Sequence, residues 1–277
     1  MTKHIVVATD LSPRADRAVA RAVLLAREHG ARLSLLHVLD DAMPDDVLRH
    51  IQPRTTEHLE RFAASAAKGL DYKVLPCVGD PTETLLDWVG DLSPSLLVLG
   101  THRPRTLMDG LRETTSQRVV RLTNCPVLVV KERADQPYDT ILAATDFSPS
   151  ATAALNLGHA LAPKAAMIPV HALYLPYEGL AGHSDQARHA LHAAMIADAH
   201  TADAQWRAGH ALPVTLGHTQ FPTGGAWMQL NRTAHESRAQ LITAGAHGRA
   251  GAHRALLGSL ATDLLRDPPC DVLIARA

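Results

Sequence analysis

The chain has 277 residues and a mass of 29.8 kDa, which is enough for two domains that each bury a core. Hydrophobic residues make up 46% of the chain and charged residues 20%, a balance that excludes long disorder, fibrous repeats and a disulfide scaffold. Lysine and arginine number 27 against 28 for aspartate and glutamate, so the positive field that attracts nucleic acid or an anionic membrane is missing.

The first half of the chain alternates between strand-like and helix-like segments. A β-branched run at 5–9 is followed by apolar residues at helical spacing, from Val19 to Ala26, which end at Gly30. Further strands are predicted at 33–39, 72–78, 96–100 and 127–130, with helices at about 54–68, at 82–92 and before the last strand. Continuous apolar strands that alternate with helices predict an α/β fold with a mostly parallel sheet, covered on both faces.

The second half repeats the first. Four segments recur in the same order: HIVVATDLS at 4–12 as TILAATDFS at 140–148, LSLLHVL at 33–39 as AMIPVHAL at 166–173, LLVLGTH at 96–102 as LITAGAH at 241–247, and NCPVLVV at 124–130 as PCDVLIA at 269–275. We therefore expect two tandem domains, 1–133 and 138–277, each a five-stranded parallel sheet with helices on both faces. The offset between the copies grows from 134 to 145 residues, which predicts an insertion near 174–238 with a helix at about 184–208.

Cysteine usage and hydropathy bear on the compartment. Cys77, Cys125 and Cys270 are an odd number without a CxxC pair, which favours a reducing cytosol over an oxidising compartment. The first apolar run is far shorter than the roughly twenty residues that a bilayer span needs, and no later segment is longer. We expect a cytoplasmic protein with no membrane span and no nucleic-acid partner.

A glycine-rich stretch in the second copy is the strongest candidate for a binding site. GAHGRAGAHRALLGS at 245–259 leaves a strand and enters a helix, at the sheet edge where ligands of such folds bind. Glycines lack a β-carbon and can adopt positive φ, so that several backbone N–H groups can approach one phosphate. The helix N-terminus adds N–H groups that attract an anion. Ser259 is expected to cap this helix, and His247, Arg249, His253 and Arg254 add positive charge. The alternative is that the stretch is only a turn.

The glycine spacing separates this loop from other nucleotide loops. The chain has no GxxxxGK[ST] motif and no GxGxxG after the first strand of either copy. Gly245, Gly248, Gly258 and Ser259 do fit the G-x2-G-x9-G-[S/T] signature of universal stress proteins. Together with the T-D-x-S, L-L-H-V and C-P-V-L-V-V segments, this makes nearly the whole chain resemble a tandem universal stress protein.

The resemblance implies two tandem Rossmann-like domains of the adenine-nucleotide α-hydrolase type. It also implies ATP, with phosphates on the glycine amides and on the Ser259 hydroxyl. Asp146 would face the ribose or a bound Mg²⁺, and the backbone around Ala172 would contact adenine. Ala144, Thr145, His247 and Arg249 complete the nucleotide-binding set that we carry over.

From the residues alone, two roles stay open for Asp146. A carboxylate at a strand end, opposite a loop rich in N–H groups, is placed to accept a ribose hydroxyl or to hold a metal-bound water. The alternative role is capping of the helix that begins near Pro149.

The first copy departs from the glycine pattern. Arg103 and Glu113 stand where the second and third glycines belong, and Thr114 takes the hydroxyl position. A β-carbon and a negative charge at these places predict weak or absent nucleotide binding. Arg103, Arg105 and Arg112 leave open that this loop holds some other anion.

The other polar groups are weaker candidates for a functional site than the glycine-rich loop. His189 and His192 are spaced to share a helix face within a histidine-rich insertion, although no HExxH motif or nearby cysteine completes a metal site. His37 and His171, at strand ends, are expected to be buried and hydrogen-bonded rather than catalytic. No catalytic set is apparent, so the sequence favours binding over turnover.

The sequence therefore predicts a cytoplasmic, ATP-binding stress-response regulator whose second domain holds the nucleotide. The alternatives are a slow ATPase or nucleotide-dependent enzyme, and a nucleotide-independent interaction module that binds metal through the insertion. The final strands, 127–130 and 272–275, are the expected edges for an intramolecular pseudo-dimer. A homodimer and an unidentified protein partner are further expectations.

Overall fold

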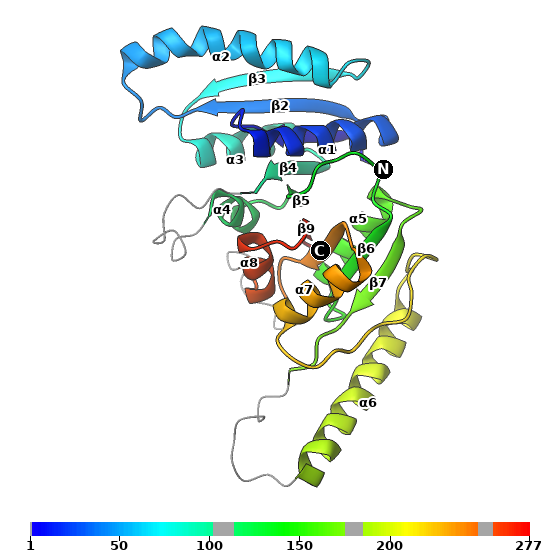
Figure 1. The fold of residues 1–277 in the computed structure, drawn as a ribbon. Coiled ribbons are helices and arrows are strands. Elements are labelled where there is room, and N and C mark those ends of the chain that lie inside the picture. Colours follow the sequence, from blue (N-terminus) through cyan, green and yellow to red (C-terminus); the bar gives the residue numbers. More distant parts are fainter. Residues whose placement is uncertain (1, 102–113, 175–184, 249–256) are drawn as a thin grey trace.

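The alternation of apolar runs and helical segments gives an α/β fold (Figure 1). The structure, a computed structural model, describes residues 2–101, 114–174, 185–248 and 257–277. The elements of the first repeat are β1 (His4–Ala8), α1 (Pro13–His29), β2 (Arg32–Leu39), α2 (Asp45–Ala66), β3 (Tyr72–Val78), α3 (Pro81–Leu92), β4 (Leu96–Gly100), α4 (Thr115–Leu122) and β5 (Val127–Val130). Those of the second are β6 (Thr140–Ala144), α5 (Pro149–Leu161), β7 (Ala166–Val170), α6 (Asp185–Gly209), α7 (Ala226–Ser237), β8 (Leu241–Gly245), α8 (Ser259–Arg266) and β9 (Asp271–Ala275).

All nine of these strands join one sheet, in the order β3-β2-β1-β4-β5-β9-β8-β6-β7. Neighbours within a repeat are parallel, whereas β5 and β9 pair antiparallel across the middle. The expected pairing of the two final strands into a pseudo-dimer is thus confirmed. Strand order reverses between β1 and β4 and again between β6 and β8, so each repeat has one switch point where a ligand site is expected.

The second repeat differs from the expected five regular strands. Where the counterpart of β3 belongs, three isolated parallel bridges join Met167 to Leu216, Val170 to Gln220 and Leu173 to Thr223. Pro222 lies in this segment, and because proline lacks an N–H group it cannot donate to a ladder. The helix expected at about 54–68 also differs, since α2 begins at Asp45 and continues through Pro53.

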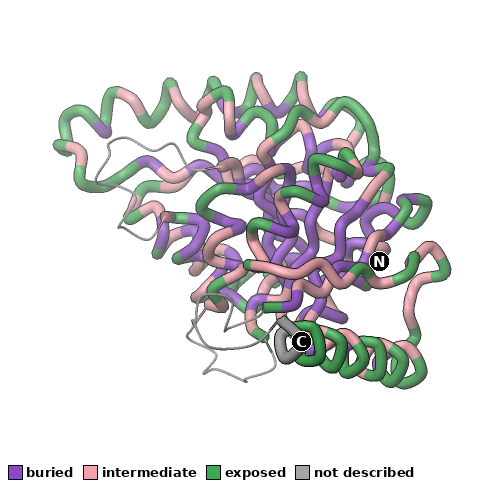
Figure 2. The backbone as a smooth tube through the Cα atoms, turned by 60° about the horizontal axis from the view of Figure 1, so that its bottom comes forward, coloured by how far each residue is buried: buried purple, intermediate pink, exposed green. Residues whose placement is uncertain are grey.

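Two helical layers cover the sheet. Alternate strand residues such as Ile5 and Val7 pack with α1, α2 and α5 on one face, and Val6 packs with α3, α4, α7 and α8 on the other. Helix α6 lies to one side of this sandwich, and most of its surface is exposed (Figures 1 and 2). Trp206, which is buried and donates to Thr152, attaches it to α5. Within the described part of the chain, the helices lack the length or apolar character that a membrane crossing requires.

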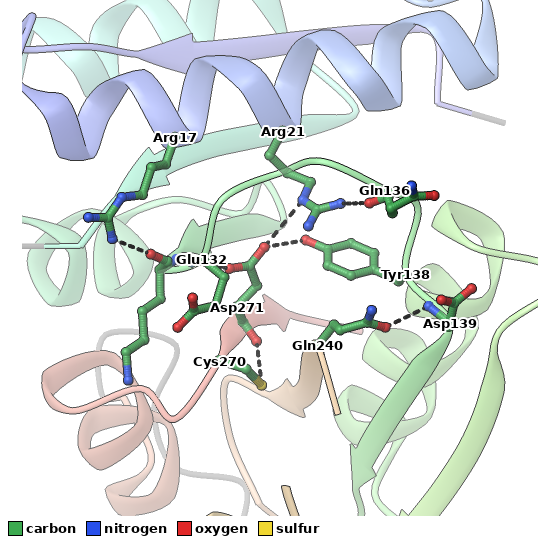
Figure 3. Close-up of polar contacts among 10 residues, drawn as sticks. Arg17, Arg21, Glu132, Gln136, Tyr138, Asp139, Gln240, Cys270 and Asp271 are labelled. Atoms are coloured by element: carbon green, nitrogen blue, oxygen red, sulfur yellow. Dashed lines mark hydrogen bonds and ion pairs between the residues drawn. The ribbon is translucent and has the colours of Figure 1, made fainter. Parts of the chain in front are cut away.

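A buried polar network joins the linker to both repeats (Figure 3). Asp271, at the start of β9, is fully buried and accepts hydrogen bonds from Tyr138 Oη at 2.7 Å and from the N–H groups of Lys131 and Glu132. The Nε atom of Arg21, from α1, lies 3.3 Å from Asp271 Oδ2, and its guanidinium stacks over the Tyr138 ring. These contacts hold the chain between the repeats against the sheet.

Candidate functional site

A cavity of about 240 Å³ opens at the switch point of the second repeat, beyond the ends of β6 and β8. The nine predicted site residues that the structure describes all line it: Ala144, Thr145, Asp146, Ala172, Gly245, His247, Gly248, Gly258 and Ser259. Arg249, His253 and Arg254 lie outside the described residues. Parallel strands place their carboxyl ends at one sheet edge, which is why segments a hundred residues apart in sequence meet here.

The described glycines of the loop serve close approach rather than positive φ. A β-carbon on Gly245 would lie 2.8 Å from Ala151 N, at the start of α5, and one on Gly248 would lie 3.0 Å from Asp146 Oδ2. None of Gly245, Gly248 and Gly258 has a left-handed backbone, so the expected use of positive φ is wrong at these three positions. Gly248 keeps the loop backbone directly against the Asp146 carboxylate.

No side-chain hydrogen bond from the described residues caps the start of α8. The expectation that Ser259 caps this helix is wrong, because the N-cap is Gly258 and Ser259 is the first helical residue. Gly258 has no side chain that could accept from the first-turn N–H groups. A helix without a side-chain cap presents these N–H groups, with their partial positive charge, to whatever fills the cavity. In the first repeat Thr114 does cap α4, by accepting from Gln117 N.

Asp146 follows β6 in a local turn and accepts from Ser148 N at 3.0 Å. The cap of α5 is Ser148, whose hydroxyl accepts from Ala151 N, so the alternative role of Asp146 as that cap is not what the structure shows. The same turn holds Phe147 with φ of +64° and stacks its ring on His171. Asp146 is thus fixed at the rim of the cavity.

His247 is held by an arginine that sequence reasoning missed. Arg276, directly after β9, donates through Nη1 to His247 Nε2. Its Nε atom donates to the carbonyl of Thr123, and its Nη2 atom donates to those of Val120 and Arg121, at the end of α4 in the other repeat. Burial, and next the Arg276 charge, lower the pKa of His247. The contact crosses between the repeats, so no short motif signals it.

The wall formed by the end of β7 offers backbone groups. The N–H groups of His171 and Leu173 bond to the carbonyls of Gln220 and Pro222. Between them, Ala172 forms no backbone hydrogen bond with any residue that the structure describes. His171 itself bonds through Nδ1 to Thr145 O at 2.8 Å, and His37 makes the equivalent bond to Thr9 O. Both expected hydrogen bonds are present, but only His37 is buried as expected, since His171 is half-buried.

The first repeat has an equivalent cavity of about 410 Å³, lined by residues of β1, β2 and β4 and by the starts of α1, α3 and α4. Arg103, Arg105, Arg112 and Glu113, on which the sequence argument about this copy depends, lie outside the described residues.

A metal centre in the histidine-rich insertion would need several ligands close together among its described residues. No group of three or more potential ligands occurs there. His192 instead bonds through Nε2 to Thr223 Oγ1, and His200 packs its ring against Phe221. His183, the first histidine of the insertion, lies outside the described residues.

Comparison with known proteins gives a consistent result. The model of the universal stress protein family matches residues 1–131 and again residues 137–276. Universal stress protein YxiE of Bacillus subtilis is 28% identical over 148 residues, which is 47% of this chain and all of that protein. A universal stress protein of Thermus aquaticus is 32% identical over 137 residues, with the same coverage. The crystal structure of a universal stress protein from Archaeoglobus fulgidus has this fold, with a TM-score of 0.71 at 18% identity, and covers 100% of this chain and 99% of its own.

Proposed function

The chain belongs to the universal stress protein family, and we propose that it is a stress-response regulator whose second repeat binds ATP. The observation that carries this proposal is the state of His247. Arginine can only donate hydrogen bonds, so His247 Nε2 must accept from Arg276 and the ring is neutral with its proton on Nδ1. Nδ1 is buried and has no hydrogen-bond partner among the described residues.

A buried donor without a partner is costly, and a ligand oxygen in the cavity would satisfy it. Close to His247, the uncapped start of α8 adds N–H groups, and Gly248 and Gly258 leave room for a phosphate to reach the backbone. Three independent features of this wall therefore favour the same anionic group.

The opposite wall suits the remaining parts of a nucleotide. The backbone N–H and carbonyl of Ala172 match the hydrogen-bonding edge of a purine, and Val170, Leu230 and Ala244 give an apolar surface for its ring. The Asp146 carboxylate lies at the rim between the two walls, where it would accept a ribose hydroxyl or hold a water of Mg²⁺. The residues present thus fit Mg-ATP, with Mg²⁺ supplying charge neutralisation of the phosphates.

The cytoplasm is the compartment that we propose. All three cysteines are free. Burial raises the pKa of Cys125 and of Cys270 to about 12, and it also raises the pKa of Cys77. Thiols held in the neutral form fit a packing role in a reducing compartment and disfavour Cys77 as a reactive group.

Small molecules released from purified, denatured protein, followed by calorimetric titration with Mg-ATP, test the proposal. We expect about one nucleotide per chain for the wild type and none for Gly248→Arg, because even a β-carbon there comes within 3.0 Å of Asp146 Oδ2. Gly90→Arg is the matched control, since Gly90 is exposed on α3 with nothing within 4 Å of its β-carbon position. No nucleotide and no heat with the wild type would contradict ATP binding.

A further inference from the structure

The cavity of the first repeat has the same position as the candidate ATP cavity but different walls. Asp10 corresponds to Asp146, Gly100 to Gly245 and Leu85 to Leu230. The two cavities therefore have the same place in the topology of their repeats. At the strand ends, the first cavity has larger side chains than the second. Leu36 replaces Val170, Val38 replaces Ala172, and Leu99 replaces Ala244. The wall at the strand ends is therefore bulkier and more apolar than its counterpart, although the cavity as a whole is larger.

The wall formed by the start of α4 is more polar than its counterpart in the second repeat, whereas the strand ends are more apolar. Thr115 and Ser116, at the start of α4, replace Leu260 and Ala261, and this wall is therefore more polar than its counterpart. Thr114 and Gln117 form a reciprocal capping box, in which Thr114 Oγ1 accepts from Gln117 N and the Gln117 side chain accepts from Thr114 N. Two N–H groups that a phosphate would use are already bonded.

The first turn of α1 contributes a guanidinium to this cavity. Arg14, in the first turn of α1, lines this cavity where the second repeat has Ser150. Its Nη1 atom is buried and forms no hydrogen bond with any described residue. A planar guanidinium with an unused donor matches a carboxylate, to which arginine bonds in a forked geometry.

Two carboxylates line the same cavity. Asp10 and Asp40 are exposed, and each uses Oδ1 to accept one N–H group, from Ser12 and Ala42 respectively. Each has a second oxygen that can accept from a cationic donor. The cavity therefore combines a guanidinium, two carboxylates and an apolar surface formed by Leu36, Leu85 and Leu99.

We propose that the first repeat binds a small zwitterion with an apolar side chain, of the α-amino acid class. Its carboxylate would pair with Arg14, its ammonium group with Asp10 and Asp40, and its side chain would pack on the leucines. The volume of about 410 Å³ is within the range of small-molecule pockets. Amino-acid binding by the first repeat does not depend on ATP binding by the second.

Calorimetric titration of the full chain with L-leucine as the probe tests this inference. Arg14→Gln should weaken leucine binding by about ten- to a hundredfold, because it removes a charge-assisted hydrogen bond. Arg61→Gln is the matched control, since Arg61 is exposed on α2 and pairs with Glu57 on the same helix. ATP binding by the second repeat should be unchanged in both variants.

Two leucine analogues and a second variant distinguish the carboxylate contact with Arg14 from the ammonium contact with Asp40. 4-Methylpentanoate lacks the ammonium group of leucine, so Arg14→Gln should weaken its binding whereas Asp40→Asn should not. 3-Methylbutylamine lacks the carboxylate and should respond only to Asp40→Asn. Because Asp40 is exposed, this variant keeps the test decisive if Arg14→Gln fails to fold. Absence of leucine binding at millimolar concentration, unchanged affinity in both variants, or a second ATP bound in the first repeat would each overturn the inference.

Discussion

His247 shows how the fold shifts the pKa of a single residue. Burial and the Arg276 guanidinium disfavour the imidazolium form, and they lower the pKa of His247 below its ordinary value of 6.5. When the pKa of a histidine is lower in the folded chain than in the unfolded chain, the histidine contributes stability at pH values above the pKa of the unfolded chain. That contribution is lost as the pH falls through 6.5 toward the folded pKa.

We therefore expect His247→Gln to be less sensitive to mild acid than the wild type. Urea unfolding at neutral pH and below the ordinary histidine pKa gives the free energy of unfolding at each pH for both proteins. The loss of stability on acidification should be smaller in the variant, because glutamine has no proton to gain. His218→Gln serves as a comparison, since His218 is exposed. An identical loss in wild type and His247→Gln would rule out this role of His247.

The residues of the candidate site could be named from the sequence, but not all of their roles. The glycine spacing and the paired T-D-x-S segments selected residues that do line one cavity. The assignment of Ser259 as a cap and of positive φ to the glycines was wrong, because a motif specifies which residues occur but not the dihedral angles between them. Arg276 acts through contacts distant in sequence, and Arg14 lines a cavity together with residues distant in sequence. Periodicity and spacing reveal neither.

At the scale of elements, Arg276 forms the C-terminal cap of α4. It donates to the carbonyls of Val120, Arg121 and Thr123, where the helix leaves its last acceptors unpaired and its dipole favours a cation. The same side chain bonds to His247, so one residue connects the candidate ATP loop to a helix of the other repeat.

Arg276→Ala should therefore reduce both stability and nucleotide affinity. We expect a loss of about 1–3 kcal/mol in the free energy of unfolding, since charge-assisted hydrogen bonds to the helix end are removed. ATP binding should weaken severalfold, because the His247 tautomer is no longer imposed. Arg266→Ala is the control, as Arg266 is exposed on α8 with a long 4.0 Å contact to Asp263. Denaturant unfolding and calorimetric titration measure the two effects, and an unchanged ATP affinity would show that Arg276 is only structural.

Most elements of the fold follow from local patterns in the sequence. The strands of the first repeat and α3 lie close to their predicted ranges, because apolar runs with period two or 3.6 reflect which face is buried. The bridged segment at 216–223 escaped prediction, as Pro222 and Gly217 interrupt the pattern that identifies a strand. The start of α2 was also missed, because this helix rests on the sheet with few buried residues.

At the scale of the whole molecule, the two repeats share one sheet and both hydrophobic clusters. Strands β5 and β9 join them through the backbone, and both hydrophobic clusters contain residues from each repeat. Arg21 from the first repeat and Asp271 from the second are almost completely buried as an ion pair, with 4% and 0% of their side chains exposed. Tyr138 and the linker N–H groups complete the partners of Asp271.

A double-mutant cycle on this pair tests how the repeats are joined. Asp271→Asn leaves the Arg21 guanidinium buried without its counter-charge, and Arg21→Met leaves the Asp271 carboxylate in the same position. Each single change should cost about 3–5 kcal/mol, the usual penalty for breaking a buried pair. The double variant should cost clearly less than the sum, because no uncompensated charge remains and the introduced amide oxygen would still accept from the N–H groups of Lys131 and Glu132. Differential scanning calorimetry should show one transition for the wild type, and two separate transitions would contradict a shared, cooperative sheet.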